Sequence, residues 1–591
     1  MIRAESPAGL ELAQQVSASG RAWSVAPVAE DTVTALATAL PCHPTVARLL
    51  CIRGVTDVDV ARQFLKPSLN TLSDPDTIPD IDEAVALIEG ALAAHDPICI
   101  YGDYDVDGVT GTAILSDVLE HLGGQVSTYI PHRLREGYGL NKDAIRRIAE
   151  SGSRLLITVD GGSNDLEELE LAQSLGMQVI VTDHHLIHGD LPSCPVVHPG
   201  RTDAAGAFAG LAGVGVAYKL AWALGRSRSG TRKVADDFRE LMLSALSLVA
   251  MGTVADVVPL VGENRALVHY GLRAFPRLTE RPGIQALLAV CGLDSDAVTS
   301  EGVGFRLAPH LNAAGRLGRA EDSLELLLTR DGQRGEELAQ QLATANRRRK
   351  EIETEMLAEC ERLAGDEISD SAGALVCAHE DFHSGVAGIV AARLVDKYHR
   401  PVFVIALNND DVGRGSIRSP DEIPLDPYYE RAREHVVSIG GHACAGGVAV
   451  RPEAVAALRE VLATTPLPDV TQSQLAVDAI LDPGDVTVEL ARALASLEPH
   501  GKGNPSPRFA LTGLRLAGAP RLVGKGEEHL SFSIRGQRGG APLKAIYFRG
   551  APHATRLATT EEPFSVVAEI LINTFTGTPR AEIRVVDLAT S

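Results

Sequence analysis

Between residues 81 and 270, short apolar runs alternate with stretches in which hydrophobic residues recur at helical spacing. The apolar runs are candidate strands at 98–101, 126–130, 155–159, 179–181 and 196–197. Strands that alternate with helices in this way predict a mostly parallel sheet covered by helices on both faces. Ligands of such sheets gather at the carboxyl ends of the strands, so the residues after each run are the first place to look for chemistry.

The rest of the chain follows other patterns. Residues 1–80 are irregular, with short helices around 46–50 and 57–64, whereas 333–366 have the spacing of one long helix. From about residue 474, apolar positions alternate with period two between glycine-rich turns, which predicts a small antiparallel barrel of OB-fold size.

We therefore predict a multi-domain α/β protein with a C-terminal β-barrel. The predicted parts are a lead-in (1–80), a parallel-sheet domain (81–332), a connecting helix (333–366), a smaller α/β domain (367–466) and the barrel (474–591).

Composition narrows the class of protein. The 591 residues are 45% hydrophobic, which is enough for several buried cores. The eight cysteines are scattered without a Cys-x-x-Cys pair, which argues for a reducing compartment and against a disulfide framework or a thiolate zinc site. We find no signal-peptide pattern and no run of 18 apolar residues, and we expect a cytoplasmic protein without a membrane segment.

The net charge of −22 at first argues against a nucleic-acid partner. However, residues 501–591 contain 12 Lys and Arg against 7 Asp and Glu, so the acidic excess lies in the rest of the chain. A basic end on an acidic body fits an enzyme that binds a polyanion at one end and cations at its active site. Chance alone would also explain this distribution.

Three carboxylates, Asp103, Asp105 and Asp107, follow the candidate strand 98–101 at alternate positions. Carboxylates this close repel one another, so they hydrate apart, become protonated or bind hard cations. An acidic surface turn is the simplest alternative. An EF-hand is excluded, because Ile114 occupies the twelfth position, where a bidentate Glu is needed.

Other candidate ligands follow other apolar runs. Asp160 follows 155–159, the triplet Asp183-His184-His185 follows 179–182, and the apolar segment 247–254 runs into Asp256. Asp160 could merely cap a helix, and we assign His188 and His198 structural roles. We nevertheless interpret these segments as strand ends that deliver several ligands to one edge of the sheet. Oxygen ligands with one or two imidazoles suit Mn²⁺ or Mg²⁺, and two such ions would make the protein a two-metal phosphoesterase.

These residues resemble the ordered motifs of the DHH phosphoesterase superfamily. Further motifs resemble its RecJ family of single-strand-specific 5′→3′ DNA exonucleases, in order from about Cys51 to Leu588. They are Arg53-Gly54, residues 130–140, residues 307–316 and residues 440–446.

The resemblance implies metal ligands at Asp103, Asp105, Asp107, Asp160, His184 and Asp256. Catalysis would involve His185, Asp105 and Asp160, with His185 either at the scissile phosphate or supporting His184. The implied cofactor is Mn²⁺ or Mg²⁺, as two ions.

The resemblance also implies substrate-binding residues. Those near the metals are Arg133, Asn312 and Arg316; those in the smaller α/β domain, which resembles a DHHA1 domain, are Ser416, Arg418, Gly441 and His442. Ser416 and Arg418 would bind the terminal 5′ phosphate. Surface ion pairs are the alternative for Arg133 and Arg316, and tight turns are the alternative for the glycines.

In the barrel, Lys525, Arg535 and Lys544 are expected phosphate contacts. The rings of Tyr547, Phe548 and Phe575 could stack on bases or belong to the core, and the core is expected for Phe532. The basic run 347–350 on the connecting helix fits a solvated face better than the wall of a DNA channel.

Some positions depart from the family pattern. His310 stands where Arg is expected, His198 where Asn is expected, and Phe382-His383-Ser384 replaces Trp-His-Pro. None of them is a predicted metal ligand, but the departures leave the number of phosphate contacts open.

The expected function is hydrolysis of single-stranded DNA from its 5′ end to mononucleotides, in DNA repair and recombination. The expected partners are a single strand and, beyond it, a helicase and a single-strand-binding protein, and we expect a monomer. Two alternatives remain: a DHH phosphodiesterase for short oligonucleotides or cyclic dinucleotides, and a catalytically silent DNA-binding scaffold.

Overall fold

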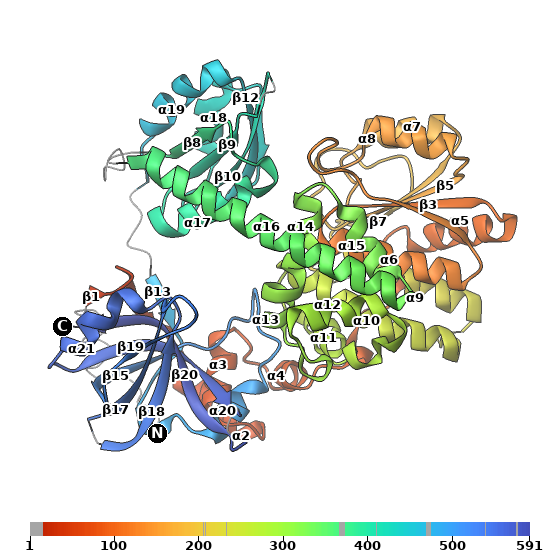
Figure 1. Cartoon of the computed structure of the whole chain (residues 1–591). Helices are drawn as coiled ribbons and strands as arrows, with labels where there is room; N and C mark the ends of the chain where they lie inside the picture. Colours follow the sequence, from red (N-terminus) through yellow and green to blue (C-terminus); the bar gives the residue numbers. More distant parts are fainter. Residues whose placement is uncertain are drawn as a thin grey trace. The chain divides into compact units, whose positions relative to one another are not determined.

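A computed structural model describes residues 16–204, 206, 208–231, 233–365, 373–408, 411–468, 474–537, 539–574 and 577–590. The chain divides into two compact units (Figure 1). The larger unit contains residues 73–258 and 270–470, and the smaller unit combines residues up to 72 with 259–269 and the segment from 471 onward. The smaller unit is therefore assembled from three separate stretches of the chain.

The first sheet of the larger unit is parallel throughout, in the order β4-β3-β5-β6-β7. Its strands are β3 (Pro97–Gly102), β4 (Gln125–Tyr129), β5 (Leu155–Val159), β6 (Gln178–Thr182) and β7 (Val196–Val197). Helices cover both faces (Figure 1). On one face lie α5 (Ile81–Ala94), α6 (Val106–His121) and α9 (Gly213–Ser229), and on the other lie α7 (Lys142–Glu150) and α8 (Leu166–Ser174). The predicted covered parallel sheet is confirmed.

The interpretation of residues 247–254 as a strand end was wrong. They form the last part of helix α10 (Asp236–Ala255), which packs against α6 and α9. Residues 245–253 are all buried, so this part of the helix has no polar face to reveal a helical period in the sequence. By length and composition α10 could cross a membrane, but in this fold it is a core helix.

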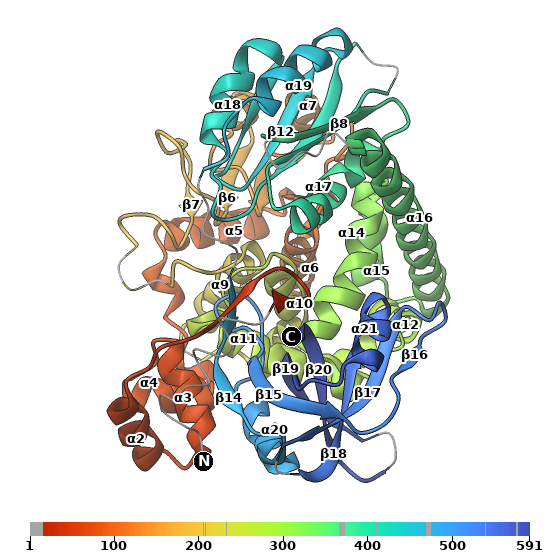
Figure 2. The same ribbon diagram turned by 90° about the vertical axis from the view of Figure 1, so that its left-hand side faces the viewer.

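More helices follow α10 along the chain. The first is α11 (Gly262–Leu272), most of which belongs to the smaller unit. The next ones belong to the larger unit and are α12 (Pro282–Cys291), α13 (Ser300–Gly302), the π-helix η5 (Val303–Leu307), α14 (Ala308–Arg316) and α15 (Ala320–Leu328). The long helix α16 (Gly332–Ala364) packs along α12, α14 and α15 and then against α17 (Ser384–Tyr398) (Figure 2). One continuous helix thus links the two α/β lobes of the larger unit.

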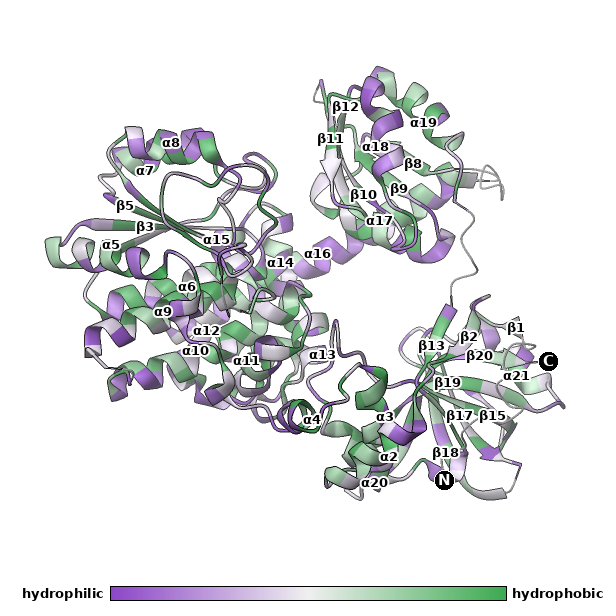
Figure 3. Ribbon diagram, turned by 180° about the vertical axis from the view of Figure 1, so that it is seen from behind, coloured by the Kyte–Doolittle hydropathy of each residue, from purple (hydrophilic) through white to green (hydrophobic). Residues whose placement is uncertain are grey.

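The second lobe contains a mixed sheet in the order β11-β12-β10-β9-β8, in which only β8 and β9 are parallel. Its strands are β8 (Leu375–His379), β9 (Val402–Ala406), β10 (Gly413–Arg418), β11 (Ser438–Gly441) and β12 (Ala445–Val450). Helices α16 and α17 cover one face, and α18 (Asp426–Ala432) and α19 (Val455–Ala463) cover the other. Strands β8 and β9 show the hydrophobic colour expected of a covered sheet (Figure 3).

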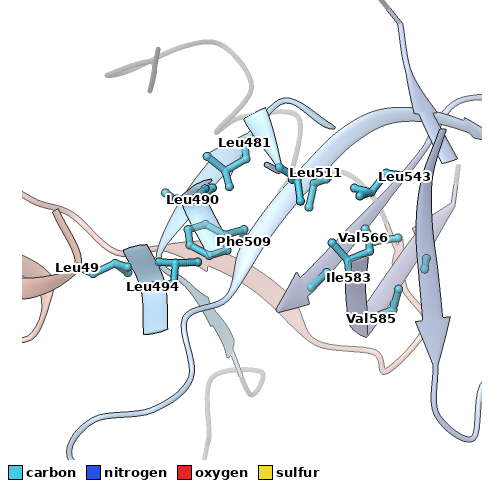
Figure 4. Close-up of a cluster of buried hydrophobic side chains, with 14 of the residues drawn as sticks. Leu49, Leu481, Leu490, Leu494, Phe509, Leu511, Leu543, Val566, Ile583 and Val585 are labelled. Atoms are coloured by element: carbon cyan, nitrogen blue, oxygen red, sulfur yellow. The ribbon is translucent and has the colours of Figure 1, made fainter. Parts of the chain in front are cut away.

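The smaller unit contains a barrel that closes through the pairings β15-β19-β20-β18-β17-β15. These strands are β15 (Phe509–Leu516), β17 (His529–Gly536), β18 (Gly539–Tyr547), β19 (Phe564–Asn573) and β20 (Arg580–Thr590). Residues such as Phe509, Leu543 and Val566 fill its interior (Figure 4). The predicted barrel is confirmed.

Residues 16–72 share this core. Leu49 of α3 (Pro44–Ile52) belongs to the same hydrophobic cluster as the barrel residues (Figure 4). Phe64 of α4 (Val58–Leu65) belongs to this cluster as well. The unit also contains β1 (Val16–Ser17), β2 (Ala22–Val25), α2 (Glu30–Ala39), β13 (Gln474–Val477), β14 (Ala479–Leu481), α20 (Val488–Ala495), β16 (Arg521–Val523) and α21 (Ala554–Thr559). Segments that read as a lead-in therefore pack with the far end of the sequence.

Candidate metal centre and anion site

The turn after β3 places three carboxylates around the start of α6. Asp103 follows the strand, Asp105 is the N-cap of α6, and Asp107 lies in its first turn. Asp105 accepts hydrogen bonds from the backbone N–H groups of Asp107 (2.8 Å) and Gly108 (3.2 Å). Asp107 in turn accepts from two N–H groups at the start of α9, at 2.7 and 2.9 Å. Helix N-termini therefore orient two of the three carboxylates.

The other predicted ligands converge on this turn. His184 follows β6, and its Nε2 lies 3.1 Å from Asp160 Oδ1, after β5, and 3.7 Å from both Asp107 Oδ2 and Asp256 Oδ2. Asp256 caps the C-terminal end of α10. Three ligand groups each have atoms within 4.8 Å of one another: Asp107-His184-Asp256, Asp160-His184-His185 and Asp103-Asp105-Asp160. Because His184 and Asp160 are shared, these groups form one continuous centre.

The protonation states fit a cation site. Asp103 Oδ1, Asp160 Oδ1 and His184 Nε2 are buried without a hydrogen bond of proper geometry among the described residues. Burial, and next the charge of Asp105, raises the pKa of Asp103 to about 8. Burial and neighbouring carboxylates also raise the pKa values of Asp107 and Asp160 well above their usual range. Hard cations such as Mn²⁺ or Mg²⁺ would stabilise the ionised forms that burial disfavours.

The two adjacent histidines are in opposite states. Burial lowers the pKa of His184 to about 4, so its imidazole is neutral, as a metal ligand must be. Burial also acts against charge on His185, but a 2.8 Å hydrogen bond to Asp183 Oδ1 raises the pKa of His185 to about 9. Burial acts against the Asp183 carboxylate too, yet its pair with His185 holds its pKa well below the usual range. His184 can therefore bind a cation, while His185 carries a proton towards the same centre.

Tyr138 was not among the predicted site residues, although it lies within the 130–140 motif. Its hydroxyl is 3.1 Å from Nδ1 and 3.2 Å from Nε2 of His185, and 55% of its surface is exposed. The role of Asp183 as the partner of His185 was also missed. Sequence spacing reveals neither contact. Tyr138 and His185 lie on separate loops, and the contact between Asp183 and His185 depends on how their side chains are oriented.

Two glycines lie directly behind the ligands. A Cβ on Gly213, at the start of α9, would lie 2.6 Å from Asp160 Oδ1. A Cβ on Gly252, in α10, would lie 2.8 Å from Asp107 Oδ1. A real Cβ atom does not come this close to another heavy atom, so any side chain at Gly213 or Gly252 would push the carboxylate away. Glycine at these two positions therefore leaves the space that the carboxylates occupy.

Beside the carboxylates lies a cluster of arginines. The guanidinium of Arg133 lies 4.7 Å from the ring centre of Tyr104, and Arg316 donates a 3.1 Å hydrogen bond to the carbonyl of Gly385. Burial, and then Arg133, Arg349 and Arg418, lower the pKa of Arg316 to about 10. Burial and Arg133 likewise lower the pKa of Arg418. The positive charges of these arginines repel one another, and a bound anion would relieve that repulsion. The cluster is therefore a candidate anion site.

Ser416 belongs to this cluster through β10. A Cβ on Gly388 of α17 would lie 3.1 Å from Arg418 Nη2 and 3.3 Å from Ser416 Oγ, so both side chains lie over this glycine. The structure thus brings together Arg133, Arg316, Arg418 and Ser416 from two lobes of the larger unit.

Family models match most of this architecture. They are the DHH family, N-terminal domain (residues 97–253), the DHHA1 domain (371–465) and the RecJ OB domain (477–587). The single-stranded-DNA-specific exonuclease RecJ of Bacillus subtilis strain 168 is 34% identical over 580 residues, which cover 97% of this chain and 71% of that protein. The chain belongs to the RecJ family.

Solved RecJ structures support this assignment. The crystal structure of Thermus thermophilus RecJ in complex with Mn²⁺ has a TM-score of 0.78 at 32% identity, over 96% of this chain and 79% of that one. The structure of the same RecJ in complex with Mg²⁺ has a TM-score of 0.73 at 31% identity, over 96% of this chain and 78% of that one. The predicted fold class is confirmed, and both ions predicted as cofactors occur in these relatives.

The departures from the RecJ pattern occupy supporting positions. His198 Nε2 lies 2.7 Å from the carbonyl of His185, Phe382 is buried in the second lobe, and His383 caps α17. His310 Nδ1 lies 2.6 Å from the carbonyl of Arg306 on the preceding turn.

The remaining predicted substrate contacts lie on α14, at the β11–β12 turn and in the barrel unit. Asn312 lies one helical turn before Arg316 on α14, whereas Gly441 and His442 are exposed at the turn between β11 and β12. In the barrel unit Lys525, Arg535 and Lys544 are exposed, and Lys544 Nζ lies 3.4 Å from Glu582 Oε1.

The barrel aromatics differ in their environments. Phe532 is buried in the core, Tyr547 stacks on His553, and Phe548 is 52% exposed beside His529. Phe575 lies outside the described residues. Phe548 is therefore the described candidate with an accessible ring face.

Proposed function

We propose that this chain hydrolyses single-stranded DNA from its 5′ end and releases mononucleotides. The observation that carries the proposal is the adjacency of a buried carboxylate–histidine centre to an arginine cluster, with Tyr104 between Asp103 and Asp105 contacting Arg133. A cation centre beside an anion site is what phosphodiester hydrolysis requires.

Each group has a proposed role in the reaction. Two Mn²⁺ or Mg²⁺ ions, held by Asp103, Asp105, Asp107, Asp160, His184 and Asp256, would supply Lewis-acid activation of water and neutralise phosphate charge. His185, held by Asp183, places its proton near the scissile phosphate. Arg133 and Arg316 bind phosphate oxygens and orient the bond for in-line attack.

The polarity follows from the end of the strand that the second lobe binds. Ser416 and Arg418 are proposed to hold the terminal 5′ phosphate. Attack on the first internucleotide phosphorus breaks its bond to the 3′ oxygen and leaves the phosphate on the shortened strand. Each cut therefore creates a new 5′ phosphate for the same site.

Further parts of the proposal concern the cellular setting. We propose a cytoplasmic monomer that acts in repair and recombination on single strands supplied by a helicase and covered by a single-strand-binding protein. Asn312, Gly441, His442 and the barrel cations Lys525, Arg535 and Lys544 are proposed to contact the strand.

The test is release of the labelled 5′ nucleotide from a single strand in Mn²⁺, Mg²⁺ or EDTA, with a blunt duplex as the control substrate. We expect metal-dependent release from the single strand and none from the duplex. Binding without cleavage in any ion would favour a silent scaffold. Cleavage confined to dinucleotides or cyclic dinucleotides would favour a small-substrate phosphodiesterase.

A further inference from the structure

A groove runs between α14 and the middle of α16, with a cavity of about 580 Å³. His310 contributes from α14, and Asn346, Arg347 and Lys350 contribute from α16. The middle of α16 is strongly hydrophilic (Figure 3). This volume falls within the range of about 300–1,000 Å³ that is typical of ligand sites.

The basic run 347–350 is divided by the helix into three environments. Arg348 pairs with Glu351 (3.1 Å) and lies 3.8 Å from Glu355. Arg349 is buried and bonds to Glu353 and to Asn346 Oδ1 (2.7 Å). Both Arg348 and Arg349 therefore have acidic partners on the same helix.

Arg347 and Lys350 differ from their neighbours. One helical turn apart, both line the groove, and among the described residues Arg347 donates a side-chain hydrogen bond only to Thr344 Oγ1, at 3.3 Å. Within the described ranges, no carboxylate lies within ion-pair distance of either side chain. Glu351 and Glu355 also line the groove, but they are the acids nearest Arg348.

The groove continues the arginine cluster. Arg349, bonded to the groove residue Asn346, is close enough to lower the pKa of Arg316. Lys350 similarly contributes to the lowered pKa of His310, after burial. Positive charge thus extends from Arg316 along α16 into the groove.

We propose that Arg347 and Lys350 bind backbone phosphates of the DNA strand, several nucleotides away from the 5′ end held at Ser416 and Arg418. The proposal rests on the proposed function, because it treats the groove as a second contact for the same strand. A long strand then gains affinity from this groove that a short one cannot reach. The basic run is accordingly part of the binding surface, and not only a solvated helical face.

The test compares two double variants in an Asp160→Ala background, in which cleavage does not interfere with binding. Arg347→Ala/Lys350→Ala removes the groove cations. Arg348→Ala/Arg362→Ala is the matched control, because it removes the same charge from exposed, acid-paired positions of the same helix. Fluorescence anisotropy then measures binding of 5′-phosphorylated strands, a trinucleotide and one of about 20 nucleotides, longer than a single OB-fold covers.

For the long strand, the groove variant should bind about tenfold more weakly and lose about 1.4 from the salt slope, about 0.7 for each single-strand phosphate contact. The control variant and the trinucleotide should show no such change. Equal losses in both variants, or none in either, would overturn the proposal.

Two further arms separate the possible explanations. If dTMP binding were weakened as much as long-strand binding, the groove would be a site for free nucleotides, and the strand proposal would fall. If the unmodified protein binds long strands through the groove but never releases nucleotides, the groove stands while the proposed exonuclease activity fails.

Discussion

The two α/β lobes of the larger unit use their sheets differently. In the first lobe every strand is parallel, so the ends of β3, β5 and β6 bring Asp103, Asp160 and His184 to one edge. In the second lobe, strand β10, which is antiparallel to β9 and β12, carries both Ser416 and Arg418 within the strand, over Gly388 of α17. The candidate ligands of the first sheet lie at the ends of its strands, whereas the candidate phosphate-binding residues of the second sheet lie on the face of a strand.

This difference matches the proposed division between catalysis and recognition of the strand end. The metal centre is acidic and buried, and helix N-termini and glycines fix its carboxylates. The proposed phosphate site is cationic and combines residues of both lobes. Substitutions of the metal ligands should therefore slow cleavage of every substrate, whereas the effect of substituting Ser416 or Arg418 should depend on whether the strand has a 5′ phosphate.

The largest expected effect comes from removing the shared ligand. Asp160→Ala should reduce kcat at least about a thousandfold, because bound metal ions contribute several kcal/mol to transition-state stabilisation. The loss should be similar for strands with a 5′ phosphate and strands with a 5′ hydroxyl. Single-turnover cleavage at saturating strand provides the measurement. A loss confined to phosphorylated strands would break the proposed division between lobes.

A smaller loss is expected from Gly213→Ala. The added Cβ must displace the Asp160 carboxylate, and a ligand shift of about 1 Å can cost about a hundredfold in rate. Mn²⁺ titration followed by thermal unfolding should show weaker binding of the ion. Gly90→Ala in α5, where a Cβ would meet no atom within 4 Å and φ is not positive, is the control for a helical glycine-to-alanine change by itself. Normal Mn²⁺ binding by Gly213→Ala would contradict the close-packing argument.

Arg418→Ala tests the recognition side. Losing a charge-assisted contact of about 1.5 kcal/mol or more should lower kcat/KM about tenfold for 5′-phosphorylated strands. Strands with a 5′ hydroxyl should be nearly unaffected, so the variant should lose the preference between them. Arg414→Ala, also on β10, serves as the matched control. Equal losses on both substrates would show that Arg418 supports the fold or the chemistry instead.

The smallest expected effect is a dependence of metal binding on pH. The Asp103 carboxyl has a pKa of about 8 in the fold, against 3.8 when unperturbed, so the metal-free fold loses stability as pH rises from about 4 to about 8. A cation must displace that proton, so protonation of Asp103 alone should make the apparent Mn²⁺ affinity about fivefold weaker at pH 7 than at pH 8. Calorimetric titration in buffers of different ionisation enthalpy would detect the released proton. No proton release at pH 7 would mean that Asp103 is already ionised.

Much of this architecture could be predicted from local pattern. The parallel strands, the long helix and the barrel have clear periods, and the carboxylates lie at strand ends. Asp256 was a predicted ligand and lies within the carboxylate–histidine cluster, but its element was wrong, because the part of α10 that precedes it is buried on all sides and has no polar period. Tyr138 and Asp183 were missed, since their roles depend on side-chain orientation around His185.

The contribution of residues 16–72 to the barrel core was beyond the reach of local pattern, because it depends on pairing between distant segments. The basic run 347–350 was another limit. Four adjacent cations look alike in the sequence, and only the helix geometry distinguishes the two that line the groove from the two with acidic partners.

The barrel unit also bears on how the chain is made. Ser17 pairs with Ala589 in the β1–β20 ladder, and Ser19 and Trp23 bond to Asp587 at 2.7 and 2.9 Å. On the ribosome, the early segment must therefore wait for strand β20 to emerge, whereas most of the larger unit is synthesised in between and can fold first. A nascent chain that stalls before β20 would leave the hydrophobic core that α3 and α4 share with the barrel incomplete, so chaperones would have the longest opportunity to bind there.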